Sequence, residues 1–411
     1  MEFLFSDLAP RAREQLILGK LSHLLMPAQV SLLGPMYGPC GSVTEAGNPT
    51  LGEFFTAEEI DLAAKWSIRL GPHVEPLLAK EELRTYIRCV LRSLEGNSSA
   101  KVVIAVQQYN PFHYLLALLC QRLGVPLWWF GGAEIPGHHA LERMGTGGNS
   151  VLAKPNRIVD NYHLSAIDRL QGFAVAEELR ALQLERPRNF NQRKVTEANK
   201  EGADIFKSST ERVVVFGSND LRTQNAEAIL ETNGLGPNIG SSVGLLHAVS
   251  EFATPRRPVL FKPHPLDDGS AQNEAAKIPN IKVLPQSLPF WAVPRNGTLG
   301  VTTVSNSAFL CQIAGIRVAT TSTLISSSGN KVYLAQSPSQ LEDFINGNGR
   351  AGLLTSAEMI ARLLVFQSVR LTGGTNFWRR FKVEDFATWL RGIAEGRLLD
   401  DQDLLEIRSQ R

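Results

Sequence analysis

Residues 257–265 (RPVLFKPHP) constrain the fold of this chain more than any other stretch. The apolar run at 259–261 has no polar break, which is typical of a strand buried on both faces of a sheet. The two prolines that follow lack backbone N–H groups, so the strand ends there. Lys262 and His264 then stand at the carboxyl end of a buried strand, where open α/β sheets bind ligands. We therefore expect an anion-binding edge here; the alternative is a proline-rich loop with a surface lysine and histidine.

Composition narrows the class of protein. The chain has 411 residues, of which 43% are hydrophobic and 20% charged, as in a globular protein with one large or two smaller domains. Its 42 basic and 40 acidic residues leave a net charge of +2, which argues against a nucleic-acid binder. The four cysteines form no C-x-x-C pair, so neither a zinc site nor a disulfide scaffold is expected.

The first residues show no signal-peptide pattern, and no run of 18 apolar residues occurs. We therefore expect a cytoplasmic enzyme, with peripheral contact at the inner membrane as a further option.

Strand and helix patterns form two arrays. Residues 1–100 are expected to be mostly helical. The pattern then predicts a strand at 101–106, a helix at 111–123 and a second strand at 125–130, with the two strands paired in parallel. The second array has predicted strands at 212–216, 259–261, 282–284, 299–304 and 317–320, and helices at 243–252 and 308–314.

A polar, helix-prone segment at 160–208 separates the two arrays. The predicted fold class is α/β, with two Rossmann-like domains facing a cleft and C-terminal helices packing back on the body. We place the N-terminal domain at 1–205, the C-terminal domain at 206–370 and the C-terminal helices at 371–411.

Two further segments of the second array carry polar residues just past a strand. Ser305, Asn306 and Ser307 stand where a strand runs into a helix, and a helix N-terminus favours phosphate because it offers free N–H groups and a positive dipole end. Asp220 follows the strand at 212–216 and is either a turn former or a nucleophile or base.

The first array ends in a glycine-rich loop at 131–150 that contains Glu134, Glu142 and Asn149. A loop this polar just past a strand is a candidate site, although a plain connection is equally expected. Carboxylates on opposite walls of a cleft are what glycosyl transfer needs: one attacks or stabilises the anomeric carbon and the other handles the acceptor proton.

These motifs resemble those of bacterial GT-B transferases that use CMP-activated acid sugars. The likeness is to the capsule-polysaccharide family of retaining β-Kdo transferases, and it covers about residues 101–320. It rests on the K-P-H-P and S-N-S motifs, on D-x-x-x-Q from Asp220 to Gln224, and on E-x-x-P-G, L-E and G-G-N-S between 134 and 150. One departure is that the Arg-Pro of the family pattern is replaced by Pro136-Gly137, which weakens the mapping of Glu134.

The resemblance implies a GT-B enzyme that moves Kdo from CMP-β-Kdo to a glycan or lipid-linked glycan acceptor with retention, through an Asp-linked intermediate. Asp220 would be the nucleophile and Glu134 the acceptor acid or base, with Glu142 in reserve. The nucleotide sugar would be held by Lys262, His264, Ser305, Asn306, Ser307, Arg222, Gln224 and Asn149. The resemblance implies no metal and no other cofactor, no nucleic-acid partner, and contact with other glycosyltransferase modules as an option.

Three other functions remain open. An inverting CMP-sialic acid transferase shares the His-Pro and Ser motifs, and a GT-B epimerase or hydrolase has the same architecture. A non-catalytic GT-B module would bind glycan or serve as a scaffold.

Overall fold

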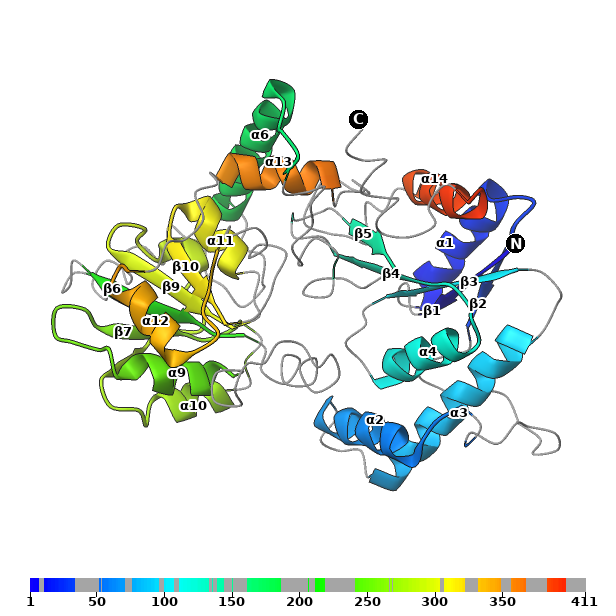
Figure 1. Cartoon of the computed structure of the whole chain (residues 1–411), viewed down its shortest axis with the longest axis horizontal. Coiled ribbons are helices and arrows are strands. Elements are labelled where there is room, and N and C mark those ends of the chain that lie inside the picture. The colour runs from blue at the N-terminus through cyan, green and yellow to red at the C-terminus, as the bar shows by residue number, and fades with distance from the viewer. Residues whose placement is uncertain are drawn as a thin grey trace. The chain divides into compact units, whose positions relative to one another are not determined.

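We describe the protein from a computed structural model (Figure 1). Its contacts divide the chain into two units, described separately below: unit 1 comprises Met1–Ala133, Gly137–Thr146 and Ser368–Arg411, and unit 2 comprises Glu134–Pro136 and Gly147–Gln367. The residues that the structure describes are 1–6, 11–33, 52, 54–70, 76–95, 100–106, 111–132, 135, 139–143, 150, 161–185, 206, 211–218, 241–265, 267, 269–303, 307–321, 332–348, 356–366 and 383–396.

Unit 1 is built on a five-stranded sheet with the order β2-β1-β3-β4-β5. All neighbouring pairs are parallel except β4 with β5. Its strands are β1 (Glu2–Ser6), β2 (Gln29–Leu32), β3 (Lys101–Val106), β4 (Leu127–Gly132) and β5 (His139–Glu142), and its helices are α1 (Arg11–Leu24), α2 (Ala57–Leu70), α3 (Pro76–Glu95), α4 (Pro111–Arg122) and α14 (Val383–Ala394).

Both faces of this sheet are covered, because successive side chains of its strands point to opposite sides. Phe3 and Phe5 of β1 pack with α1 and α14 on one face, whereas Leu4 packs with α2, α3 and α4 on the other (Figure 1). The ring of Phe386 in α14 lies 4.7 Å from that of Phe130 in β4, measured between centroids. The last described helix therefore packs on the body of unit 1, as expected for the C-terminal helices.

Unit 2 holds a six-stranded, wholly parallel sheet with the order β11-β10-β9-β6-β7-β8. In chain order this is the doubly wound Rossmann arrangement, and its topological switch point lies between β6 and β9. The strands are β6 (Arg212–Phe216), β7 (Val259–Lys262), β8 (Ile281–Val283), β9 (Thr298–Thr302), β10 (Arg317–Thr320) and β11 (Tyr333–Leu334). The helices are α6 (Ala166–Glu185), α9 (Ser242–Ser250), α10 (Ser270–Ala275), η4 (Phe290–Ala292), α11 (Ser307–Ala314), α12 (Pro338–Ile345) and α13 (Ser356–Phe366).

The core of unit 2 follows the same alternation. Val213 and Val215 face α9, α10 and α12, whereas Val214 and Phe216 face α11 and η4. The run at 212–216 is buried along its whole length, and after Arg212 at its start it is wholly apolar, as expected for a strand covered on both faces.

Helices α6 and α13 pack closely in unit 2 because Gly172 has no side chain. A Cβ at this position would overlap the carbonyl oxygen of Ala357 and would stand 2.9 Å from the backbone nitrogen of Ala361. The N-terminus of α6 is capped by Ser165, whose backbone N–H donates to Asp168 Oδ2 and whose Oγ accepts from the Asp168 N–H.

The predicted fold class, α/β with two Rossmann-like domains, is confirmed. The prediction that residues 1–100 are mostly helical is wrong for β1 and β2, and β1 is an interior strand of the unit 1 sheet. Its five residues include Glu2, which is 7% exposed and accepts a hydrogen bond of 2.8 Å from Ser31 Oγ. A strand of five residues that begins with a carboxylate gives no alternating pattern to recognise.

Candidate functional site

The carboxyl edge of the unit 2 sheet brings the ends of β6, β7 and β9 together. In register, Phe216 of β6 stands opposite Lys262 of β7 and Thr302 of β9. Ligands of open α/β sheets bind outside this edge, at the switch point between β6 and β9. The residues that directly follow these three strands are therefore candidate ligand contacts.

Buried hydroxyl groups join the strand ends at the switch point. Ser218 Oγ lies 2.6 Å from Thr303 Oγ1, and the Ser218 N–H donates to Ser242 Oγ at 3.0 Å. Thr302 Oγ1 donates to the carbonyl oxygen of Phe216 at 2.9 Å. All four hydroxyl-bearing residues are at most 5% exposed. They fix the backbone from which the next residues of each loop leave the sheet, since buried hydrogen-bonded groups are costly to separate.

Gly217 allows the end of β6 to approach the turn after β7. A Cβ on Gly217 would lie 3.0 Å from the His264 backbone nitrogen and 3.1 Å from Phe261 Cε2. The Gly217 N–H donates to the Lys262 carbonyl oxygen at 2.9 Å. Glycine is needed here for close approach, so the backbone before Asp220 is fixed against the backbone that carries His264.

Lys262 is almost wholly inside the protein, with 4% of its surface exposed. Its ammonium donates to the carbonyl oxygens of Pro263 at 2.9 Å and Gln286 at 3.0 Å. Burial lowers the pKa of Lys262 from 10.5 to about 8. In this conformation its charge holds backbone carbonyls at the edge of the site, and the described residues provide acceptors for two of its three ammonium protons.

His264 is half-buried and lies in a short turn that we call the His264 turn, residues 263–265 and 267. The Asp267 N–H donates to the His264 carbonyl oxygen at 2.9 Å. Gln286 Nε2 donates to the carbonyl oxygens of His264, Pro265 and Asp267 at 3.1, 3.3 and 2.8 Å. Sequence reasoning missed Gln286, because nothing in a turn after β8 signals contact with a turn 19 to 22 residues earlier.

Ser307 is the first residue of α11 and is half-buried. Phe309 and Cys311 of this helix are buried in the core, which holds the N-terminus of α11 at the carboxyl end of β9. The structure thus places His264 and Ser307 at one edge of one sheet, as predicted. Ser305 and Asn306 fall outside the described residues, and so do Asp220, Arg222 and Gln224.

In unit 1, Glu142 ends β5 opposite Trp129 of β4 and is 1% exposed. Its carboxylate is closed to solvent in this conformation, so its reserve role as acid or base stays a prediction. Glu134 and Asn149 lie outside the described residues.

A polar cluster at the switch point of the unit 1 sheet was not foreseen. Ser6, at the carboxyl end of β1, has its Oγ 2.9 Å from His113 Nε2 and 3.3 Å from the Tyr86 hydroxyl. His113 is fully buried and the other two are at most 2% exposed. The sequence pattern does not indicate this cluster, because His113 lies within an apolar helix and Ser6 ends a strand that was not predicted. Their burial makes them a link between β1, α3 and α4.

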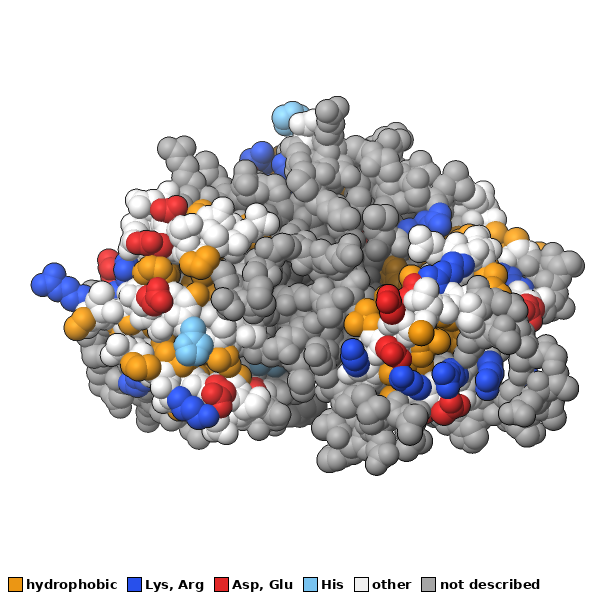
Figure 2. Space-filling view, turned by 60° about the horizontal axis from the view of Figure 1, so that its bottom comes forward, with side chains coloured by type: hydrophobic (Ala, Val, Ile, Leu, Met, Phe, Trp, Pro, Cys, Tyr) orange, Lys and Arg blue, Asp and Glu red, His pale blue; other side chains and the backbone are white. Residues whose placement is uncertain are grey.

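Nucleic-acid, metal and membrane binding each place a requirement on the described residues. Among the described side chains on the face drawn in Figure 2, acidic and basic groups are interspersed. Within the described ranges, no group of three or more His, Cys, Asp and Glu side chains could hold a metal ion. None of the helices described is both long enough and apolar enough to cross a bilayer.

Comparisons with known proteins give structural likenesses only. No protein-family model matches the sequence, and no curated protein matches it. A solved structure of Thermosulfurimonas dismutans KpsC, described as a beta Kdo 2,7 transferase, is 15% identical, with a TM-score of 0.42 over 83% of this chain and 97% of that chain. KpsC of the same organism, described as a beta Kdo 2,4 transferase, is 10% identical, with a TM-score of 0.42 over 88% and 89%.

UDP-GlcNAc 2-epimerase of Methanocaldococcus jannaschii, solved in complex with UDP-GlcNAc and UDP, is 12% identical, with a TM-score of 0.33 over 89% of this chain and 99% of that chain. Because these TM-scores lie below 0.5, we base the functional proposal on the residues of this chain.

Proposed function

We propose that the protein is a GT-B glycosyltransferase whose nucleotide sugar binds at the carboxyl edge of the unit 2 sheet. One observation carries the proposal: His264 and the N-terminus of α11 at Ser307 stand at the ends of β7 and β9, which flank β6 and its switch point. The positive dipole end of a helix and an imidazole at the same sheet edge are suited to a phosphate.

The donor we propose is CMP-β-Kdo. It has a single phosphate, whose charge can be balanced by a helix N-terminus and one cationic side chain, without a metal ion. The K-P-H-P and S-N-S motifs and their resemblance to those of CMP-dependent transferases support this choice. The acceptor would be a glycan or lipid-linked glycan, and the reaction would take place in the cytoplasm or peripherally at the inner membrane.

The proposed mechanism is a double displacement with net retention. Asp220 attacks the anomeric carbon and expels CMP, which forms a covalent Kdo adduct; the acceptor hydroxyl then displaces Asp220 while Glu134 takes its proton. Support for Asp220 comes from the backbone that leads to it, because Gly217 and Ser218 are fixed by contacts with the His264 turn and the hydroxyl groups. An attacking carboxylate needs precise placement relative to the anomeric carbon.

The test is a donor screen with CMP-Kdo, CMP-sialic acid and UDP-GlcNAc, read as nucleotide release in the presence of a mixed glycan acceptor. We expect CMP release from CMP-Kdo. By calorimetry, His264→Ala should weaken CMP binding by about 10- to 150-fold, the equivalent of one charge-assisted contact. His247→Ala is the matched control, because this exposed histidine of α9 makes no side-chain hydrogen bond among the described residues.

Release from UDP-GlcNAc alone would contradict the donor class. Unchanged CMP affinity in His264→Ala would place the nucleotide elsewhere. Turnover of CMP-sialic acid with an inverted product would favour the inverting alternative.

A further inference from the structure

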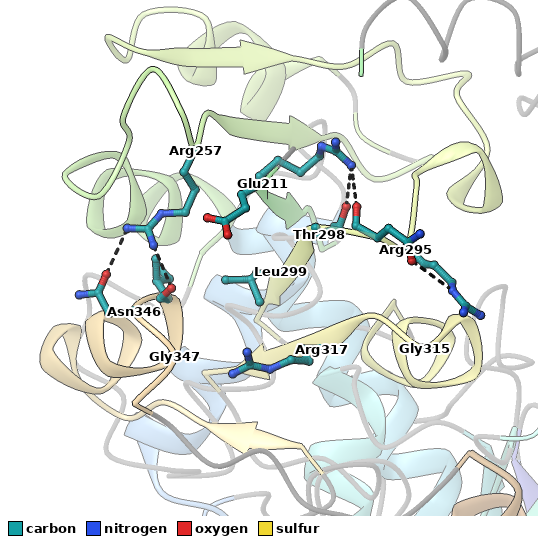
Figure 3. A pocket seen from close by; sticks show the side chains of 13 residues that line it. Glu211, Arg257, Arg295, Thr298, Leu299, Gly315, Arg317, Asn346 and Gly347 are labelled. Carbon is teal, nitrogen blue, oxygen red and sulfur yellow. Dashed lines mark hydrogen bonds between the residues drawn. The ribbon is translucent and has the colours of Figure 1, made fainter. Parts of the chain in front are cut away.

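The amino edge of the unit 2 sheet holds a pocket that the proposed chemistry does not use. Its volume is about 480 Å³, within the range of small-molecule sites. The strands β7, β6, β9 and β10 are neighbours in the sheet, and one arginine stands at the first residue of each or within the three residues before it. These arginines are Arg257, Arg212, Arg295 and Arg317. Figure 3 labels Arg257, Arg295 and Arg317. Glu211 is the one acidic residue among the described residues of the lining.

Two of the arginines are held by the protein itself. Arg212 is 5% exposed, and its guanidinium donates to the Asn296 carbonyl oxygen and to Thr298 Oγ1, both at 3.2 Å. Arg257 donates to the Ile345 carbonyl oxygen at 3.0 Å and to Asn346 Oδ1 at 3.1 Å. The Arg257 Nε is buried and has no acceptor among the described protein atoms. These contacts fix the position of both cations in the pocket wall.

The other two arginines are exposed at the pocket. Arg295 makes one long contact, 3.5 Å from its Nε to Asn296 Oδ1. The side chain of Arg317 makes no hydrogen bond with described residues, and its guanidinium carbon lies 5.5 Å from the centre of the Phe344 ring. Figure 3 shows Arg317 and Glu211 beside the floor residue Leu299, with Arg257 and Arg295 on either side.

The four arginines of this pocket outnumber its acidic residues among the described lining, where Glu211 is the one carboxylate. Neither Arg257, Arg295 nor Arg317 has a carboxylate oxygen within 4.0 Å in the ranges that the structure describes. Arginine stays protonated in proteins, so the like charges repel one another. The group that relieves this repulsion is an oxyanion, which a guanidinium binds with two parallel N–H bonds.

We propose that this pocket binds a small molecule carrying two or more phosphate or carboxylate groups. The volume exceeds that needed for a single inorganic ion, and fixed and exposed arginines from four strands allow separate oxyanion groups to be held at once. The site lies at the opposite edge of the sheet from His264 and Ser307, so it is distinct from the proposed nucleotide site. The proposal does not depend on the donor being CMP-Kdo.

The experiment is calorimetric titration of the full chain with pyrophosphate, inorganic phosphate and citrate. We expect saturable binding of pyrophosphate that is at least tenfold tighter than that of phosphate. If citrate binds with an affinity similar to that of pyrophosphate, the ligands of the pocket include polycarboxylates. Arg317→Ala and Arg295→Ala should each weaken pyrophosphate binding about tenfold or more. Both side chains are exposed, and circular dichroism checks that the variants fold.

Arg256→Ala is the matched control, because this exposed arginine precedes Arg257 but does not line the pocket. It should leave pyrophosphate affinity within twofold of the wild type. His264→Ala should do the same, and saturating CMP should not displace pyrophosphate.

Three outcomes would overturn the proposal: no saturable binding of pyrophosphate or citrate, equal weakening by Arg256→Ala and Arg317→Ala, or loss of pyrophosphate binding in His264→Ala. Binding that depends on Arg317 in a protein that binds no CMP would leave this inference standing and would refute the proposed function alone.

Discussion

Replacing Gln286 with alanine tests whether one side chain holds the His264 turn in place. In the native structure its Nε2 lies 2.8 to 3.3 Å from three carbonyl oxygens of that turn, including that of His264. Alanine removes the donor and leaves these carbonyls to water or unpaired. The same variant keeps the Gln286 backbone carbonyl, which accepts from Lys262 Nζ. The change is therefore confined to the amide clamp.

The amide has two protons for three acceptors, so it makes the equivalent of two hydrogen bonds. Each contributes about 0.5–1.5 kcal/mol net, which predicts a loss of about 1–3 kcal/mol in the ordering of the turn. If the turn must be ordered for nucleotide binding, CMP affinity should fall by about 5- to 150-fold. Gln286→Glu should cost more, because its carboxylate would face three carbonyl oxygens without a proton to donate.

Urea unfolding measures the stability of each variant and calorimetry measures its CMP affinity. Gln336→Ala is the control, since this exposed glutamine of unit 2 makes no side-chain hydrogen bond among the described residues. Wild-type stability and affinity in Gln286→Ala would refute the clamp. Lower stability with unchanged CMP affinity would refute the link between the turn and the nucleotide.

Three further predictions concern packing, protonation and chemistry. Gly172→Ala should lower the free energy of unfolding in urea by about 1–3 kcal/mol, because its Cβ would push α6 away from α13. Gly19→Ala in α1 has open space around its Cβ and should raise the free energy of unfolding by about 0.5–1 kcal/mol. Equal effects of the two variants would contradict this prediction. Burial lowers the pKa of Lys262 from 10.5 to about 8, so between these pH values the unfolded state binds more protons than the folded state. The free energy of unfolding should therefore rise with pH in this range, by up to ~1.4 kcal/mol per pH unit relative to Lys262→Met. Parallel curves of unfolding free energy against pH for the wild type and Lys262→Met would refute this. Asp220→Ala should abolish turnover with the fold intact, and intact-mass analysis of the wild type mixed with CMP-Kdo and no acceptor should show one added Kdo. EDTA should leave turnover unchanged. Loss of turnover in EDTA that Mg²⁺ restores would count against the CMP-sugar donor.

The sequence predicts unit 2 well because its strands are buried apolar runs that end at prolines, glycines or small polar residues. The runs at 212–216 and 317–320 are strands with the predicted bounds, and β7 is one residue longer than its predicted run because Lys262 still pairs in register. Parallel pairing then places the residues after each strand on one edge. This is why the strand pattern alone predicts that His264 and Ser307 lie at the same edge.

Other features depend on contacts between distant residues and leave no local pattern. Glu2 is a buried carboxylate at the start of β1, and Ser31 of the neighbouring strand donates a hydrogen bond to it. Gln286 reads as a turn residue, and its three acceptors become visible only once β7 and β8 are paired. From the sequence, Lys262 is predicted to be a phosphate ligand at a strand end. In the structure it donates to two carbonyl oxygens, and these contacts depend on tertiary packing.

The pocket at the amino edge shows the same limit. Its four arginines are separated by 22 to 45 positions in the sequence and show no motif. They meet because the doubly wound order makes β7, β6, β9 and β10 neighbours.

Hydrogen–deuterium exchange of the wild-type protein with and without CMP tests the central claim, that the nucleotide binds at the carboxyl edge of the unit 2 sheet. We expect saturating CMP to slow exchange in peptides that contain Gly217, His264 and Ser307. Peptides from the opposite edge, which contain Asn296 or Asn346 of the arginine pocket, should exchange at the same rate with and without CMP. Slower exchange only at other sites, or no change at saturation, would contradict the claim.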